Sequence, residues 1–524
     1  MEAIESREGA GSLQKAGKVT LSFPLIEIAR DFPFYGIAQG SYVLAGLVGL
    51  AVYTRFLALE EYGFYVLTMT TVSVAELVGC GWINQALLRY YAEHKRRGTL
   101  SALFSHLIVL EGVSLFLLLG IWWAGISLAD FLDPRLSRLL RIGGIVLLSR
   151  VAFNVAITLV RAERLTWRYS VYSAVASLGG VGLAWAFLDV FHSGADGLLY
   201  GVSVAMGVVC CSEFVRLRRI GGFRWSVVSA EYAKKWLGYG MPLIGASVGV
   251  LWLSWGDRYL LQYFLGPEKV GIYAAGYDLV DKSLRAAFSV LTATAFPVVL
   301  ETVAGKESDI VQRMLARVLR LGVIVMIPLT VLVIAMKREM IALVLGPSFV
   351  EAHVVVPWIA VGSLCWGLSQ VVSQELQIKE RTPLLLFFLL IGTCVNLGLN
   401  VVLIPRFGIV GAAVSTTIAY LVYLSMCVAV SSHARWGLRS WLGSVLAKSA
   451  VAAIVMWSGM TLIPVRVSNR ILAIAVRSII GGCIYLGILL VAKEGTACGL
   501  ARRLADLMRW GRRGGAFEAR SDDS

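Results

Sequence analysis

Residues 255–297 read WGDRYLLQYFLGPEKVGIYAAGYDLVDKSLRAAFSVLTATAFP, and this stretch decides how the rest of the chain is interpreted. An apolar run ends in the charged pair Asp257 and Arg258, and a Gly-Pro turn follows at residues 266–267. A second apolar run then covers residues 270–300 and is interrupted by only four charged residues. These are Asp278, Asp281, Lys282 and Arg285.

The spacing of these four charges, i, i+3, i+4 and i+7, places them on one stripe of a helix. Each aspartate precedes a basic residue by four positions, the favourable order for a helical ion pair. At about 1.5 Å per residue the stripe falls roughly 12–22 Å along the helix, in the middle of a hydrocarbon layer about 30 Å thick. Ionisable groups at that depth face a bundle interior or a wet cavity. Two readings stay open: ion pairs that lock the helix against its neighbours, and the lining of a hydrophilic substrate cavity.

The composition predicts an all-α polytopic membrane protein. Hydrophobic residues make up 58% of the 524 positions, charged residues only 15%, and the mean hydropathy is +0.75. One soluble core cannot hide so much apolar surface. The net charge of +15 is explained by Lys and Arg on cytoplasmic loops, and no basic cluster with interleaved aromatics suggests nucleic-acid binding.

About fourteen transmembrane helices are expected from apolar segments of about 20 residues. They lie near 34–54, 63–88, 102–124, 139–160, 169–189, 195–215, 237–261, 270–298, 316–336, 352–376, 383–404, 409–432, 441–463 and 471–492. The connections are too short for an extramembrane catalytic domain, so we expect no enzyme. Lys and Arg on the termini and even-numbered loops outnumber those on the odd-numbered loops by about three to one, which predicts that both termini are cytoplasmic.

Weak internal echoes indicate that a six-helix unit is repeated. Residues 56–65 resemble 264–273, residues 163–164 resemble 380–381, and residues 197–201 resemble 408–411. An offset of six spans keeps the orientation, so we expect two lobes with pseudo-two-fold symmetry and a binding site in the cleft between them. The predicted organisation is an N-terminal segment (1–33), first lobe (34–215), basic inter-lobe loop (216–236), second lobe (237–432), two additional helices (433–492) and basic tail (493–524).

Four segments carry a resemblance to a known family. They are RFLALEEYGFY (55–65), GDRYLLQYFLGPEKVGIYAA (256–275), LVLGPSFVEA (343–352) and NLGLNVVLIPRFGIVGAAVSTTIAY (396–420). Together they resemble the Wzx-type flippases of polysaccharide biosynthesis, in the multidrug/oligosaccharidyl-lipid/polysaccharide superfamily. The resemblance implies a fold like that of multidrug and toxin extruders, with two six-helix lobes around a V-shaped cavity. It also implies translocation of undecaprenyl-diphosphate-linked oligosaccharide across the bacterial inner membrane, for O-antigen, exopolysaccharide or capsule.

Such a substrate suggests which side chains meet it. A diphosphate calls for cations, for which Arg258, Lys282, Arg285, Arg150 and, at the cytoplasmic mouth, Arg30 are candidates. Amides that could meet sugar hydroxyls are Gln39, Asn84, Gln85, Asn154, Gln370, Gln374, Asn396 and Asn400. Two alternatives stay open: Asn396 and Asn400 could join helices by hydrogen bonds, and Asp257 with Arg258 could be a snorkelling ion pair at a helix end.

Three single carboxyls within the predicted spans, Glu76, Glu111 and Glu375, are either ion-coupling sites or neutral structural acids. We expect no cofactor and no metal, and leave coupling to H⁺ or Na⁺ open. The expected partners are the lipid-linked oligosaccharide, membrane lipids, and a polymerase or glycosyltransferases of the same pathway. The rival functions are an ion-coupled multidrug extruder and a lipid II flippase of the same fold.

Overall fold

The computed structural model describes residues 23–128, 133–217, 228–304, 308–431, 438–462, 469–495 and 498, without the side chains at 23–32, 290–313, 438–442 and 470. These residues are helical, with no strand among them, which confirms the predicted all-α class. The predicted terminal segments 1–33 and 493–524 and the loop 216–236 lie largely outside this description.

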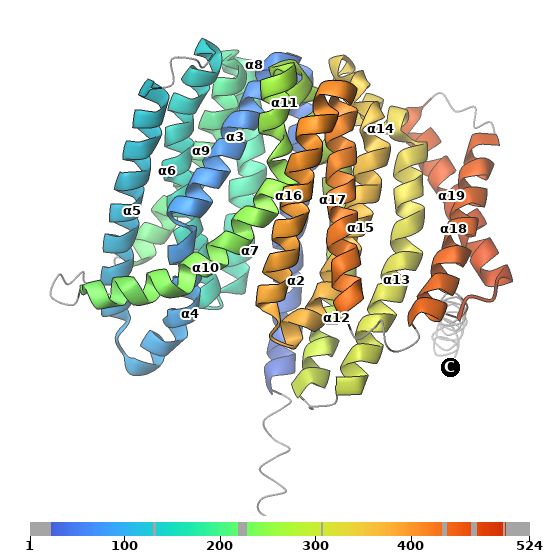
Figure 1. Cartoon of the computed structure of the whole chain (residues 1–524). Coiled ribbons are helices and arrows are strands. Elements are labelled where there is room, and N and C mark those ends of the chain that lie inside the picture. The colour runs from blue at the N-terminus through green and yellow to red at the C-terminus, as the bar shows by residue number, and fades with distance from the viewer. Residues whose placement is uncertain are drawn as a thin grey trace, which may run out of the picture. The chain divides into compact units, whose positions relative to one another are not determined.

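Long helices account for most of the described chain (Figure 1). In order they are α2 (Phe23–Phe56), α3 (Leu59–Gly79), α4 (Gly81–Arg97), α5 (Leu100–Leu128), α6 (Pro134–Ala162), α7 (Thr166–Ala174), the π-helical turn η1 (Val175–Gly179), α8 (Gly180–Phe191), α9 (Gly194–Leu217), α10 (Ala230–Trp255), α11 (Asp257–Leu265), α12 (Pro267–Ala304), α13 (Ser308–Ala335), α14 (Lys337–Val344), the 3₁₀ helix η3 (Pro347–Val354), α15 (Val356–Ile378), α16 (Thr382–Phe407), α17 (Ile409–Val430), α18 (Leu438–Leu462) and α19 (Arg470–Val491).

Among the described residues, twelve helices are long and apolar enough to cross a membrane, or thirteen if the bent pair α3 and α4 counts as one span. Each of the fourteen predicted spans overlaps one helix or a run of consecutive helices. The exact count of fourteen is not confirmed, because α12 is outside the set of apolar helices and its side chains beyond Ser289 are not described. The protein is a multi-pass membrane protein.

Two predicted spans are broken rather than continuous. The second, predicted as 63–88, bends by 48° between α3 and α4 at Cys80, which is flanked by Gly79 and Gly81. Glycines on both sides lower the helix propensity there, and the indole N–H of Trp82 donates to the carbonyl of Gly79 at 3.0 Å. The seventh, predicted as 237–261, is divided at Gly256 between α10 and α11.

The chain forms two compact units. The first contains residues 1–49 and 68–248, and the second contains residues 50–67 and 249–524. The segment 50–67 is fastened within the second unit by backbone groups: Arg55 donates to the carbonyl of Leu343 at 2.6 Å, and the amide of Gly346 donates to Thr54 Oγ1 at 3.1 Å. The predicted lobe boundaries stay a prediction.

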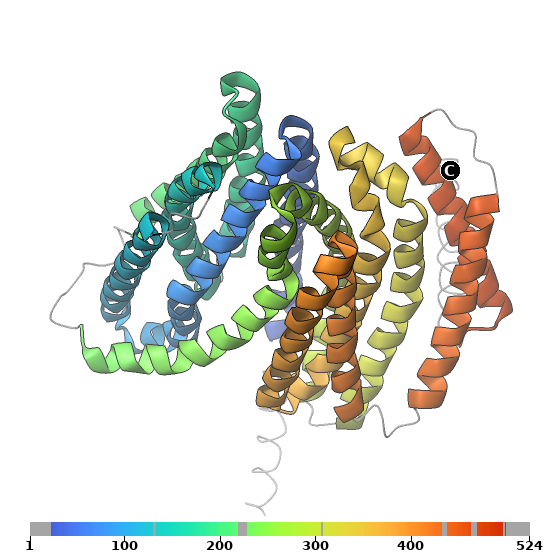
Figure 2. The same cartoon turned by 45° about the horizontal axis from the view of Figure 1, so that its top comes forward.

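The predicted repeat is visible in the local structure of the two units. In the first unit α9 packs against both α6 and α8, and in the second unit α17 packs in the same way against α15 and α16 (Figure 1 and Figure 2). Left-handed residues end the equivalent helices, namely Arg164 with Glu380, and His192 with Gly408, at equal sequence separations. The structural equivalence is therefore one residue out of register with the predicted pairing of 163–164 with 380–381.

The first echo brings its two copies into direct contact within the second unit. A methyl group at Gly63 would collide with the carbonyl of Pro267, 2.7 Å from its carbon. A methyl group at Gly271 would likewise collide with the carbonyl of Leu59 and lie 3.1 Å from the nitrogen of Gly63. The pairs 59/267 and 63/271 have the same sequence separation, so the contact is reciprocal, as at a two-fold axis.

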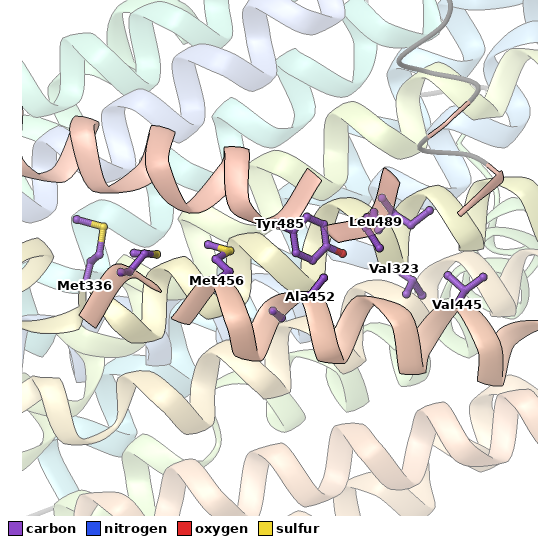
Figure 3. Close-up of a cluster of buried hydrophobic side chains, with 10 residues drawn as sticks. Val323, Met336, Val445, Ala452, Met456, Tyr485 and Leu489 are labelled. Atoms are coloured by element: carbon purple, nitrogen blue, oxygen red, sulfur yellow. The ribbon is translucent and has the colours of Figure 1, made fainter. Parts of the chain in front are cut away.

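The two C-terminal helices pack on the second unit through an apolar cluster, shown in Figure 3. Side chains of α18 and α19 meet α13 there, and the cluster is built from Val323, Ile324, Met336, Val445, Ala452, Ala453, Met456, Met460, Tyr485 and Leu489. An ion pair between Arg477 and Glu339, at 2.7 Å, adds a link from α19 to α14.

Candidate functional site

The charged stripe on α12 has the pairing that its spacing predicts. The ammonium of Lys282 donates to Asp278 Oδ2 at 3.1 Å, and Nε of Arg285 donates to Asp281 Oδ1 at 2.7 Å. Both are the expected i, i+4 pairs. Ser363 of α15 also donates to Asp281 Oδ1, at 3.3 Å. The stripe therefore faces a neighbouring helix of its own unit as well as pairing with itself.

Arg258 joins this stripe from α11. Its guanidinium donates to Asp278 Oδ1 at 2.8 Å, and its side chain is only 7% exposed. Asp278 thus lies between two cations, Arg258 and Lys282. The alternative of a snorkelling pair at a helix end is wrong, because Asp257 and Arg258 are both buried in the second unit. Burial of this kind requires partners for each charge, and Asp278 supplies one.

Asp257 anchors a second chain of hydrogen bonds, across α12, α17 and α16. It accepts from the phenol of Tyr273 and from Thr416 Oγ1, the latter at 3.2 Å. Asn396 donates to Thr416 at 3.2 Å, and Asn400 donates to the side-chain oxygen of Asn396 at 3.0 Å. Both asparagines are buried. The arrangement is the one expected if the pair joins helices, and it positions the helix that carries Asp257 and Arg258.

Two cations of the stripe remain accessible. The side chain of Lys282 is 31% exposed and that of Arg285 is 41% exposed. The guanidinium of Arg285 lies over the ring of Trp366, 5.8 Å from its centroid, and Trp366 packs on Tyr420 with ring centroids 5.1 Å apart. Tyr277 and Tyr420 share a hydrogen bond of 3.1 Å beneath them. The buried rings fix the position of Arg285, while its charge stays available to an anion.

Three of the predicted residues meet in the first unit. The amide of Asn154 donates to Glu76 Oε1 at 2.9 Å, and Nε of Arg150 lies 3.7 Å from Glu76 Oε2. The third predicted carboxyl of the first unit, Glu111, is close enough to Glu76 for the two charges to repel each other. Helices α3, α5 and α6 therefore gather one cation and two carboxyls.

The other predicted residues are placed separately. Gln39 is exposed on α2, and Glu375 is paired with Lys379 one turn further along α15. Arg30 belongs to α2, but its side chain lies outside the described residues. The sequence analysis missed Tyr273, Ser363, Trp366 and Tyr420, because hydroxyls and rings inside apolar helices give no distinctive spacing. Thr416 could have been found, since it lies in the segment 396–420.

Comparison with known proteins gives a family and two curated relatives. A family model described as "Polysaccharide biosynthesis protein" matches residues 52–354. The probable low-salt glycan biosynthesis flippase Agl15 of Haloferax volcanii is 25% identical over 270 residues, which are 50% of this chain and 55% of that protein. The probable flippase AglR of the same organism is 26% identical over 291 residues, which are 53% and 57% of the two chains. The chain thus spans about half the length of the curated relatives it matches.

Solved structures with a similar fold include a lipid II flippase, MurJ, in an inward closed conformation. It superposes with a TM-score of 0.71 at 13% identity, over 87% of this chain and 98% of that one. The Vibrio cholerae MATE transporter VcmN superposes with a TM-score of 0.56 at 15% identity, over 77% and 95% of the two chains. At these identities the likeness concerns the fold alone, and it confirms the predicted extruder-like fold.

Proposed function

This chain belongs to the polysaccharide biosynthesis protein family, and from that premise we propose that it is a flippase for lipid-linked oligosaccharides. The proposal is supported by the names of the relatives Agl15 and AglR, which are flippases rather than enzymes, and by the multi-pass fold. In its finer form, the substrate is an undecaprenyl-diphosphate-linked oligosaccharide, and the membrane is the bacterial inner membrane with both chain termini in the cytoplasm.

The accessible cations Lys282 and Arg285 carry the proposal to the level of residues. The sugar head and diphosphate of such a lipid cannot cross hydrocarbon unaided, since each unsatisfied polar group costs several kcal/mol there. In this proposal the ammonium of Lys282 and the guanidinium of Arg285 bind the diphosphate in a chamber between two lobes. Asp278 and Asp281 balance both cations when no substrate is present.

The same cations argue against the rival multidrug extruder. A site for cationic drugs favours exposed carboxylates, whereas here Asp278 and Asp281 are engaged and the more exposed groups are basic. A lipid II flippase remains an alternative substrate assignment, because both lipids carry a diphosphate. A polymerase and glycosyltransferases of the same pathway are the proposed partners, and coupling to H⁺ or Na⁺ belongs to the proposal as well.

A leaflet assay tests this function. In cells depleted of the protein, lipid-linked oligosaccharide is expected to accumulate on the cytoplasmic leaflet, as measured by accessibility to an impermeant sugar-modifying reagent. Lys282→Gln with Arg285→Gln is expected to reproduce that accumulation at least tenfold, because a charge-assisted contact contributes about 1.5–3 kcal/mol.

Lys269→Gln is the matched control for that assay. Lys269 lies on the same helix, and its ion pair with Glu351, at 2.7 Å, is exposed on both sides. Its loss should leave flipping unchanged. Normal flipping by the double variant would refute the assignment of the two cations, while unchanged leaflet distribution in depleted cells would refute the function. Accumulation of lipid II alone would transfer the function to the lipid II alternative.

A further inference from the structure

The break between α3 and α4 places an unusual set of groups inside the first unit. Glu76 lies on the last turn of α3, one turn before Cys80 at the 48° bend. Helices α5 and α6 pack next to this broken span, and they carry Glu111 and Arg150. Broken helices within membrane proteins expose backbone and side chains to bound ions and substrates, so this break is a plain place to look for a binding site.

Glu76 has the partners that an ionised carboxylate needs. One oxygen accepts a hydrogen bond of 2.9 Å from Asn154, and the other lies 3.7 Å from Nε of Arg150. The residue is buried, with 8% of its surface exposed. A buried anion with an amide donor and a guanidinium beside it is electrostatically compensated. Glu76 and Arg150 together therefore carry no net charge.

Glu111 is in the opposite situation. Both of its carboxyl oxygens are buried and have no hydrogen-bond partner among the described residues. The charged groups around it are Glu76, whose charge repels an anion, and, through the broken span, the thiol of Cys80 that interacts with both carboxyls. Arg150 of α6 is already engaged by Glu76. A second anion here would be buried without compensation, which a membrane interior penalises strongly.

We propose that Glu111 and Glu76 form a proton-binding pair whose occupancy is set by Arg150. With Arg150 beside Glu76, the pair holds one proton, on the carboxyl of Glu111. When Arg150 leaves to pair with another anion, the carboxylate of Glu76 loses its compensating charge and takes up one proton from water at Oε2. When Arg150 returns, that O–H bond breaks and the proton is released.

This inference rests on the proposed function in one respect: the anion that attracts Arg150 would be the diphosphate of the transported lipid. Binding of one substrate would then be accompanied by uptake of one proton, and its release by loss of that proton. A proton fits the site better than a metal ion, because among the described residues no three His, Cys, Asp or Glu side chains gather around a point. The guanidinium of Arg150 would also repel a second cation.

Infrared difference spectroscopy of the full-length protein in liposomes tests the pair directly. At neutral pH the wild type should show the carbonyl band of one buried carboxylic acid, and Glu111→Gln should remove it. Arg150→Gln should add a second acid band, and Glu76→Gln on that background should remove the second band again. Glu375→Gln is the control: its carboxyl is paired with Lys379, so the acid bands should stay as in the wild type.

The outcomes separate this inference from the proposed function. Absence of an acid band that depends on Glu111, or no new band in Arg150→Gln, would overturn the proton-binding pair even if glycolipid flipping is normal. A band that moves with Na⁺ at fixed pH would also overturn it, in favour of a metal cation. Bands that behave as described in a protein that flips no glycolipid would instead overturn the function and leave the site in place. A shift in the pH profile of flipping in Glu111→Gln, absent in Glu375→Gln, would support both.

Discussion

Replacement of Gly63 by alanine is expected to lower the free energy of unfolding by about 3 kcal/mol, the upper end of the usual cost of overpacking. The added methyl group would meet the backbone carbonyl of Pro267, and a carbonyl within a helix cannot rotate away as a side chain could. The start of α3 must then move away from the start of α12. Thermal unfolding in detergent, followed by circular dichroism, measures the loss.

Gly398→Ala is the matched control for Gly63→Ala. Gly398 is also a helical glycine, but a methyl group there has nothing within 4 Å. Its replacement should leave stability unchanged or raise it by about 1 kcal/mol, because alanine favours the helix. Gly271→Ala should cost about as much as Gly63→Ala, and the double variant less than the sum, since one displacement relieves both collisions. Equal melting of Gly63→Ala and Gly398→Ala would contradict the reciprocal contact.

Replacement of Arg258 by methionine is expected to have the other large effect. Removing one partner of a buried ion pair costs about 3–5 kcal/mol, because the remaining charge is left buried. Asp278 would keep only Lys282, which is partly exposed, and Asp257 would lose a nearby positive charge. Folded yield after detergent extraction, together with thermal unfolding, measures the result.

A second substitution distinguishes buried charge from lost packing in the Arg258 variant. Asp278→Asn in the Arg258→Met background should restore part of the stability, because it removes the uncompensated anion. Lys269→Met, which breaks the exposed pair with Glu351, should change stability by no more than about 0.5 kcal/mol. If Arg258→Met is as stable as Lys269→Met, the buried network does not hold α11 against α12.

Regular spacing was enough to predict much of this molecule. The i, i+4 order of Asp278 with Lys282, and of Asp281 with Arg285, predicted two ion pairs that the structure contains. Such pairs depend only on the rise and turn of one helix. Apolar length likewise predicted where the helices lie, because burial in lipid imposes the same minimum length on every span.

Contacts between helices distant in sequence could not be read in the same way. Arg258 reaches Asp278 only because a break at Gly256 turns α11 towards α12, and a glycine in an apolar run does not by itself announce a break. The hydroxyl of Thr416 completes the environment of Asp257 from a helix more than 150 residues further along the chain. Its role depends on how α17 is rotated against its neighbours, which no local pattern in α17 specifies.

The reciprocal contact between Gly63 and Gly271 has a consequence for inheritance. In an ancestor of half this length that paired with its own copy, these two positions would have been one residue meeting itself across the axis. A single substitution there would have altered both sides of the contact at once, with no chance of a compensating change opposite. Joining the two copies in one chain frees each position to vary while the other stays glycine.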